Sequence, residues 1–239
     1  MLKRRFNIHP GWIVVIGVAV ILFGTAGSRF SFGIFLKPLT EDFGWSRGSL
    51  SGALAIAGLS TGLLRPFAGW IADRYDPVRV ALIGVGLGGI ALLGLSRVQN
   101  LWQLYALFIV MGIGFTLASP ATLTKLVSVR FTRRRSLALS LAGSGSAVGE
   151  TALVPLSAVI LVLSGWRSAY MVLAAILLLG IIPIALMLLR ARPGAEEGEE
   201  PAAQSRNTSA CYWAPDDGMS LREAAKTPIF WALTAGFFT

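Results

Sequence analysis

The chain has 239 residues, of which 54% are hydrophobic and only 14% are charged. Soluble domains carry about 25% charged residues, and apolar runs longer than about 18 residues indicate membrane spans, so an ordinary soluble fold is excluded. The net charge of +9 does not indicate nucleic-acid binding, because the basic residues lie at the ends of the apolar runs. With a single cysteine, the chain has no intrachain disulfide and no cysteine metal cluster, and we expect neither a metal nor a cofactor.

Six apolar runs follow one another, and we expect each to cross the membrane as a helix. The first is too long for the apolar core of a signal peptide, about 7–15 residues, so we expect an uncleaved span. Gly84 and Gly88 in the third run predict a close helix–helix contact. The fifth run contains GSGSAVGE and Pro155, which favours a bent or locally unwound helix. The expected spans are residues 12–36, 49–71, 80–95, 101–127, 137–163 and 169–189.

The distribution of basic residues predicts the orientation of these spans. We expect Lys37 and Pro38 to end the first span, and short outer turns to follow at 41–46, 97–100 and 164–168. Cytoplasmic segments of membrane proteins carry an excess of Lys and Arg. Most of the basic residues lie on the side of the membrane opposite these outer turns, which we therefore take as the cytoplasmic side: Lys3, Arg4, Arg5, Arg74, Arg79, Arg130, Arg133, Arg134, Arg135, Arg190 and Arg192. The sequence therefore predicts a cytoplasmic N-terminus and an integral protein of a bacterial-type inner membrane.

Four regions follow from this pattern. Residues 1–11 form a cytosolic N-terminus, and residues 12–189 form the six-span bundle. Residues 190–227 are polar, include an acidic run at 196–200, and predict a disordered cytosolic linker. Residues 228–239 begin a seventh apolar run, and we expect a truncated span because twelve residues do not cross a bilayer core of about 30 Å.

A charged hairpin with the sequence GWIADRYDPVR occupies residues 69–79, between two long apolar runs. Asp76 followed by Pro77 predicts a helix N-cap with proline at the first helical position. The hairpin resembles the signature loop between the second and third spans of the major facilitator superfamily, with Asp76 where that family usually has glycine. The resemblance implies that a conformational gating loop, which holds the two halves of a transporter together in one access state, is formed by Gly69, Asp73, Arg74 and Arg79.

A second resemblance lies between the fourth and fifth spans, in RFTRRRSLALSLAGSGSAVG. Monocarboxylate and oxalate/formate-type porters have at this place an aromatic residue, a basic cluster, Leu-Ala and then Ala-Gly-Ser. The segments RFSFGIFLKPL, GWRSAY and REAAKTPIFWAL point to the same porters. The matching residues are Phe131, Arg133, Arg134, Leu137, Ala138, Ala142, Gly143 and Ser144. The cytoplasmic basic loop consists of Arg130, Arg133, Arg134 and Arg135.

These resemblances imply an all-α membrane fold, namely the N-terminal six-helix bundle of a transporter built as a 3+3 inverted repeat. The expected function is secondary active transport of a small organic anion, a mono- or dicarboxylate, by alternating access; proton coupling and exchange both fit. Alternating access requires a C-terminal six-helix half as partner besides the lipid bilayer. Two alternatives stay open: a half-size protein that acts as a homodimer or regulatory partner, and a porter of another substrate class. An enzyme is not expected, because no nucleophile–base set or phosphate loop is present.

Two charged residues inside the spans are the substrate-binding candidates. Arg29 lies within the first span, where a charge is costly, so we expect it to face a central cavity and bind a carboxylate, unless it extends to the interface or bonds a neighbouring helix. Glu150 is the acidic residue of the fifth span, and it is either a proton-coupling carboxylate or a structural partner for an arginine such as Arg29. Arg65 in the second span is expected to be an interfacial residue or a partner of the charged hairpin rather than a substrate ligand.

Overall fold

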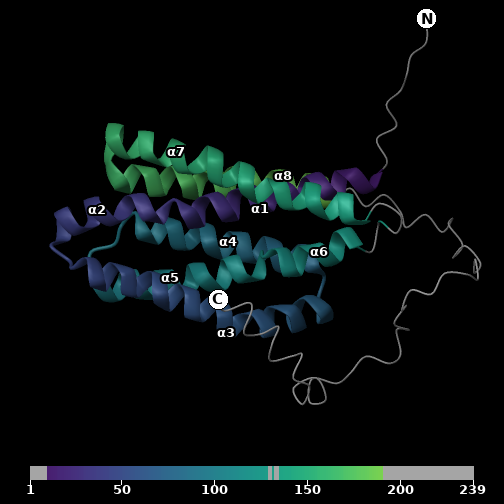
Figure 1. Cartoon of the computed structure of the whole chain (residues 1–239), viewed down its shortest axis with the longest axis horizontal. Helices are drawn as coiled ribbons and strands as arrows, with labels where there is room; N and C mark the ends of the chain where they lie inside the picture. Colours follow the sequence, from purple (N-terminus) through teal and green to yellow (C-terminus); the bar gives the residue numbers. More distant parts are fainter. Residues whose placement is uncertain (1–9, 129–130, 132–134, 191–239) are drawn as a thin grey trace, which may run out of the picture. The chain divides into compact units, whose positions relative to one another are not determined.

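Every regular element in the described part of the chain is a helix. The computed structural model describes residues 10–128, 131 and 135–190, so most of the expected linker and the start of the seventh run lie outside it. Figure 1 shows the helices side by side. In chain order they are α1 (Pro10–Phe30), α2 (Phe32–Phe43), α3 (Arg47–Arg74), α4 (Pro77–Leu95), α5 (Leu101–Leu117), α6 (Pro120–Ser128), α7 (Arg135–Ala175), the π-helix η1 (Ile176–Ile181) and α8 (Ile182–Arg190).

Among the residues that the structure describes, five helical runs are long and apolar enough to cross a membrane: Gly11–Phe43, Arg47–Ala72, Pro77–Leu95, Leu101–Val127 and Arg135–Leu189. The last has 55 residues, about 80 Å of helix at 1.5 Å per residue, which is more than twice a bilayer core of about 30 Å. It is interrupted at Gly165, whose φ of 80° is a left-handed conformation that glycine adopts readily. Figure 1 shows α7 turning back on itself, so that α8 returns beside α1.

The helix ends differ from the sequence prediction in three places. Pro38 does not end the first helical run, because α2 continues to Phe43 and closes with Gly44 at φ 65°. A break at Ser31 separates α1 from α2, and Pro120 starts α6 after a break at Ala118 and Ser119. The expected unwinding at GSGSAVGE is wrong, because α7 is continuous through this stretch.

Glycines set the closest helix contacts. A Cβ added to Gly149 of α7 would lie 2.1 Å from the carbonyl oxygen of Phe23 in α1, so only glycine permits this approach. Between α4 and α5, a Cβ at Gly84 would lie 2.5 Å from the carbonyl oxygen of Gly114, and one at Gly88 would meet the ring of Phe115. The predicted close-packing face at Gly84 and Gly88 is therefore confirmed.

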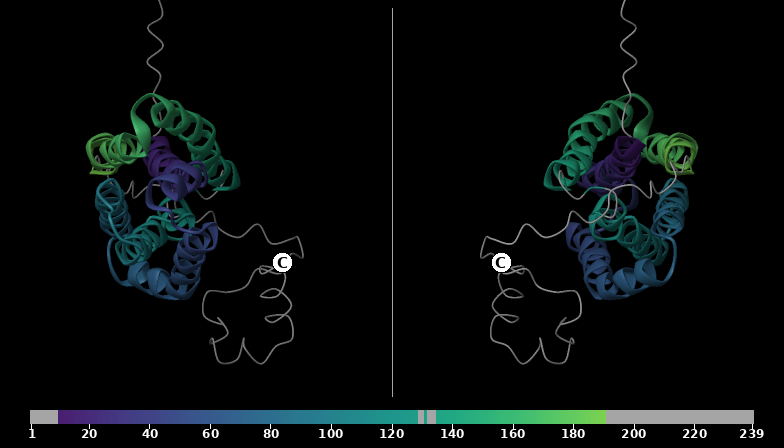
Figure 2. Two further views of the ribbon diagram at one scale, coloured as in Figure 1. Left: turned by 90° about the vertical axis from the view of Figure 1, so that its left-hand side faces the viewer. Right: turned by 90° about the vertical axis from the view of Figure 1, so that its right-hand side faces the viewer.

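The helices form two packed groups. α1 packs against α7 and α8, whereas α5 packs against α3 and α4, and the end-on views of Figure 2 show both groups. The outward faces are apolar: only 6% of the most apolar stretch of α3 is buried, and Leu59, Leu63 and Phe67 are among its exposed side chains. Soluble proteins rarely expose such surfaces, and these faces fit lipid or protein contacts within a membrane.

Candidate functional site

Arg29 is an exposed cation in the middle of the first helical run. It lies in the last turn of α1, 18 residues after Gly11 and 14 before Phe43, or more than about 20 Å of helix from either end. Gly27 and Ser31 face α7, and Arg29 is rotated about 200° from Gly27 around the helix, so its side chain leaves α1 on the other side. Within the described residues Arg29 forms no ion pair, which leaves its guanidinium group available to an anion.

Glu150 lies midway along the first arm of α7, 15 residues after Arg135 and 15 before Gly165. Its side chain is half-buried, and the adjacent Gly149 packs against Phe23 of α1. The structure does not bring Glu150 and Arg29 together, because no ion pair joins them in the described part of the chain. Both alternatives for Glu150, a proton-coupling carboxylate and a structural partner for an arginine, stay predictions.

The charged hairpin is built as predicted. α3 ends at Arg74 and α4 begins at Pro77; between them the carboxylate of Asp76 accepts a hydrogen bond from Val78 N at 3.1 Å. This arrangement confirms the N-cap with proline at the first helical position. The guanidinium of Arg74 lies 5.5 Å from the ring centroid of Trp70, and Arg79 Nε lies 3.9 Å from Asp76 Oδ2.

The other candidate residues lie in the charged hairpin, in the basic loop and on α3. A Cβ at Gly69 would meet nothing within 4 Å, so packing among the described residues does not require glycine there. Asp73 lies in the last turn of α3, but its side chain is outside the described atoms. Of the basic loop, Arg135 is exposed at the start of α7, and Arg130, Arg133 and Arg134 lie outside the described residues. Arg65 is exposed on α3.

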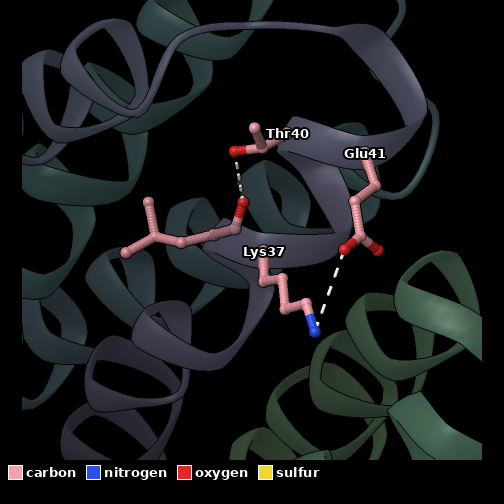
Figure 3. A network of polar contacts seen from close by, with 4 residues as sticks. Lys37, Thr40 and Glu41 are labelled. Carbon is pink, nitrogen blue, oxygen red and sulfur yellow. Dashed lines mark hydrogen bonds and ion pairs between the residues drawn. The ribbon is translucent and has the colours of Figure 1, made fainter.

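Several long-range contacts were not predicted from the sequence. Trp166 Nε1 donates a hydrogen bond to Asp42 Oδ2 at 2.6 Å, and Ser157 Oγ lies 3.2 Å from Ser31 Oγ. Asp42 and Trp166 lie in the turns expected at 41–46 and 164–168. That their side chains meet could be predicted only if the packing of the helices were already known. Nearby on α2, Lys37 Nζ lies 3.9 Å from Glu41 Oε1, and the hydroxyl of Thr40 donates to the carbonyl oxygen of Leu36, as Figure 3 shows.

The described residues include isolated charges within apolar helices. No group of three His, Cys, Asp or Glu side chains able to hold a metal ion occurs within residues 10–128 and 135–190. Arg29 supplies a cation and Glu150 a carboxylate at similar depth in an otherwise apolar bundle. Intramembrane charges of this kind are typical of ion and substrate pathways.

These features define an integral membrane protein whose apolar helices carry isolated charges. The model of the Major Facilitator Superfamily matches residues 18–239, and the chain belongs to this superfamily. Its members and the curated relatives of this chain are transporters and not enzymes.

Three relatives illustrate the similarity. The chain is 25% identical to the uncharacterized MFS-type transporter YcxA of Bacillus subtilis over 77% of this chain and 46% of that protein. It is 28% identical to monocarboxylate transporter 4 of Rattus norvegicus over 82% of this chain and 42% of the relative. With the oxalate:formate antiporter of Oxalobacter formigenes it shares 22% identity over 95% of this chain and 51% of the relative. The chain thus spans about half the length, or less, of these relatives.

Proposed function

We propose that the protein is a secondary active transporter of small organic anions, mono- or dicarboxylates, moved with protons or by exchange through alternating access. The observation that carries the proposal is Arg29, an exposed guanidinium group at mid-span with no ion pair in the described part of the chain. A charged side chain at this depth costs a few kcal/mol on insertion scales. A carboxylate substrate would offset that cost, and relatives are named for monocarboxylates, oxalate and formate.

We infer that residues 12–189 cross the membrane six times as a 3+3 inverted repeat. The break at Gly165 supports two crossings within Arg135–Leu189. The packing supports the repeat, because the first span contacts the fifth and sixth through α7 and α8, and the fourth contacts the second and third through α3 and α4. If spans one, two and three are exchanged with spans four, five and six, the contacts of the first span become those of the fourth. An inverted repeat requires this equivalence.

The same proposal assigns roles to the other candidate residues. Glu150 would carry the proton of a coupled cycle, since it is a half-buried carboxylate at mid-span without an ion pair in the described region. Gly69, Asp73, Arg74 and Arg79 would form the gating loop against a second six-helix half. The open space at Gly69 supports this, because a glycine that the described bundle does not need is available to another helix. The basic loop would lie in the cytoplasm, with the N-terminus on the same side of a bacterial-type inner membrane.

The test is uptake of labelled oxalate and formate into proteoliposomes by the complete protein that contains these 239 residues. We expect Arg29→Ala to abolish uptake without loss of inserted protein, and Arg29→Lys to retain part of it because the positive charge remains. Arg97→Ala serves as the control, because Arg97 is an exposed arginine in a turn outside the helices. Unchanged uptake by Arg29→Ala would remove Arg29 from the site.

A further inference from the structure

The first helical run is interrupted two residues after Arg29, at one member of a buried pair of serines. Ser31 separates α1 from α2, and Ser157 lies on the first arm of α7, 126 residues further along the chain. Both side chains are fully buried, at 0% exposure, and their hydroxyl oxygens lie 3.2 Å apart. Serine side chains commonly hydrogen-bond across the interface between two membrane helices, and buried polar groups are as a rule paired.

Each hydroxyl also contacts the backbone of its own helix. Ser31 Oγ lies 2.7 Å from the carbonyl oxygen of Gly27, which also accepts the backbone N–H of Ser31 at 3.1 Å. Ser157 Oγ lies 2.7 Å from the carbonyl oxygen of Leu153. A serine hydroxyl has one proton, so these two residues supply two protons for three contacts, and the Ser157 hydroxyl is shared between Leu153 and Ser31. Back-bonding to the carbonyl four residues earlier often bends helices, but α7 is continuous at Ser157, which makes the same bond, so back-bonding alone does not explain the break at Ser31.

Arg29 lies between two points at which this segment contacts α7. On one side, a Cβ at Gly27 would lie 2.6 Å from the carbonyl oxygen of Gly149, so the two backbones are in direct contact. On the other side, Ser31 contacts Ser157. Both contacts face α7, and Arg29 is on the opposite side of the helix. The direction in which the Arg29 side chain leaves α1 is therefore set by how the backbone at 27–31 sits on α7.

We propose that Ser31 and Ser157 are positioning residues, a buried hydroxyl pair that fixes the backbone on which Arg29 is presented to a carboxylate anion. The proposal rests on the proposed function for the identity of the anion, but not for the geometry. Loss of either hydroxyl removes the contact between the helices together with that residue's own bond to a carbonyl, and leaves the other hydroxyl with its carbonyl partner. The segment at 27–31 then keeps its contact with α7 at Gly27 but loses the one at Ser31, so the backbone beyond Gly27 shifts on α7 and displaces the guanidinium group at the end of a long side chain.

The first experiment measures the position of residue 29 without any substrate. In a Cys211→Ser background, Arg29→Cys is labelled with a positively charged methanethiosulfonate, and the rate is compared with and without Ser157→Ala. We expect a change of at least threefold in the rate, the same change with Ser31→Ala, and no further change in the double variant. Ser60→Ala is the matched control, because Ser60 donates to the carbonyl of Ile56 at 2.8 Å on α3 and its hydroxyl forms no hydrogen bond to another helix among the described residues.

The second experiment measures oxalate and formate uptake by the complete protein with Arg29 intact. We expect Ser157→Ala to raise KM three- to tenfold and to leave kcat within twofold, whereas a merely structural role lowers the amount of folded protein without this split. An unchanged labelling rate overturns the proposal whatever the substrate is. A changed labelling rate in a protein that moves neither oxalate nor formate supports the positioning role and contradicts the proposed function.

Discussion

The contact between α1 and α7 makes a quantitative prediction for Gly149→Ala. An ordinary van der Waals contact begins at 3.4 Å, and the added Cβ would lie 2.1 Å from the carbonyl oxygen of Phe23, so the two helices must separate locally by about 1.3 Å. The neighbouring atoms are backbone and have no rotamer that relieves the overlap. Overpacking of this kind typically costs about 1–3 kcal/mol, partly offset by the gain of up to about 1 kcal/mol when alanine replaces glycine within a helix.

Gly143→Ala is the matched control. Gly143 lies on the same arm of α7, but a Cβ there would meet nothing within 4 Å, so only the helical gain remains. The two variants, which make the same chemical change six residues apart, are thus expected to shift stability in opposite directions. At about 2–4 °C per kcal/mol for a chain of this length, the difference in melting temperature should be roughly 2–12 °C.

The assay measures the melting temperature of the purified chain in detergent. Samples are heated to a series of temperatures, and size-exclusion chromatography gives the amount of protein that has not aggregated at each. Gly149→Ala should melt below the parent chain, and Gly143→Ala should melt at or above it. If Gly149→Ala is as stable as Gly143→Ala, the helices do not approach as closely as the structure describes, and the reasoning from glycine contacts is refuted.

Three further predictions follow from the described contacts. Asp42→Ala removes the acceptor of Trp166 Nε1 and should cost about 1–3 kcal/mol of stability; unfolding in detergent measures this, and Asp42→Asn should restore most of it. Asp76→Ala should cost about 1 kcal/mol by loss of the N-cap of α4, again measured by unfolding. Glu150→Gln should flatten the pH dependence of uptake in the complete protein, and an unaltered pH profile would rule out proton coupling through this residue.

The sequence predicted those parts of the fold that depend on local chemistry. Apolar length placed the spans, and the Asp76–Pro77 pair placed the start of α4, because an N-cap and a fixed proline φ act on their immediate neighbours. Pro38 was misjudged: proline removes one backbone donor, but α2 continues past it and ends only at Gly44. GSGSAVGE was misjudged for a related reason, since its glycines permit a close contact with α1 and do not unwind α7.

The candidate site was predicted only in part. Arg29 and Glu150 were recognisable because any charge within an apolar run is conspicuous, and the structure describes both at mid-span. Their separation was not predictable, because it depends on which faces of α1 and α7 meet. For the same reason neither Ser31–Ser157 nor Asp42–Trp166 was visible in the sequence, since each pair joins residues more than 120 positions apart.

The central claim is that the bundle crosses the membrane six times, and cysteine accessibility tests it most directly. In a Cys211→Ser background, single cysteines replace Arg47, Tyr75, Gln99 and Ser164, and intact cells are treated with a membrane-impermeant thiol reagent. The account predicts that residues 47, 99 and 164 are labelled from outside and that residue 75 is labelled only after the membrane is opened. Labelling of residues 47 and 75 from the same side, or protection of residue 164 in intact cells, would contradict it.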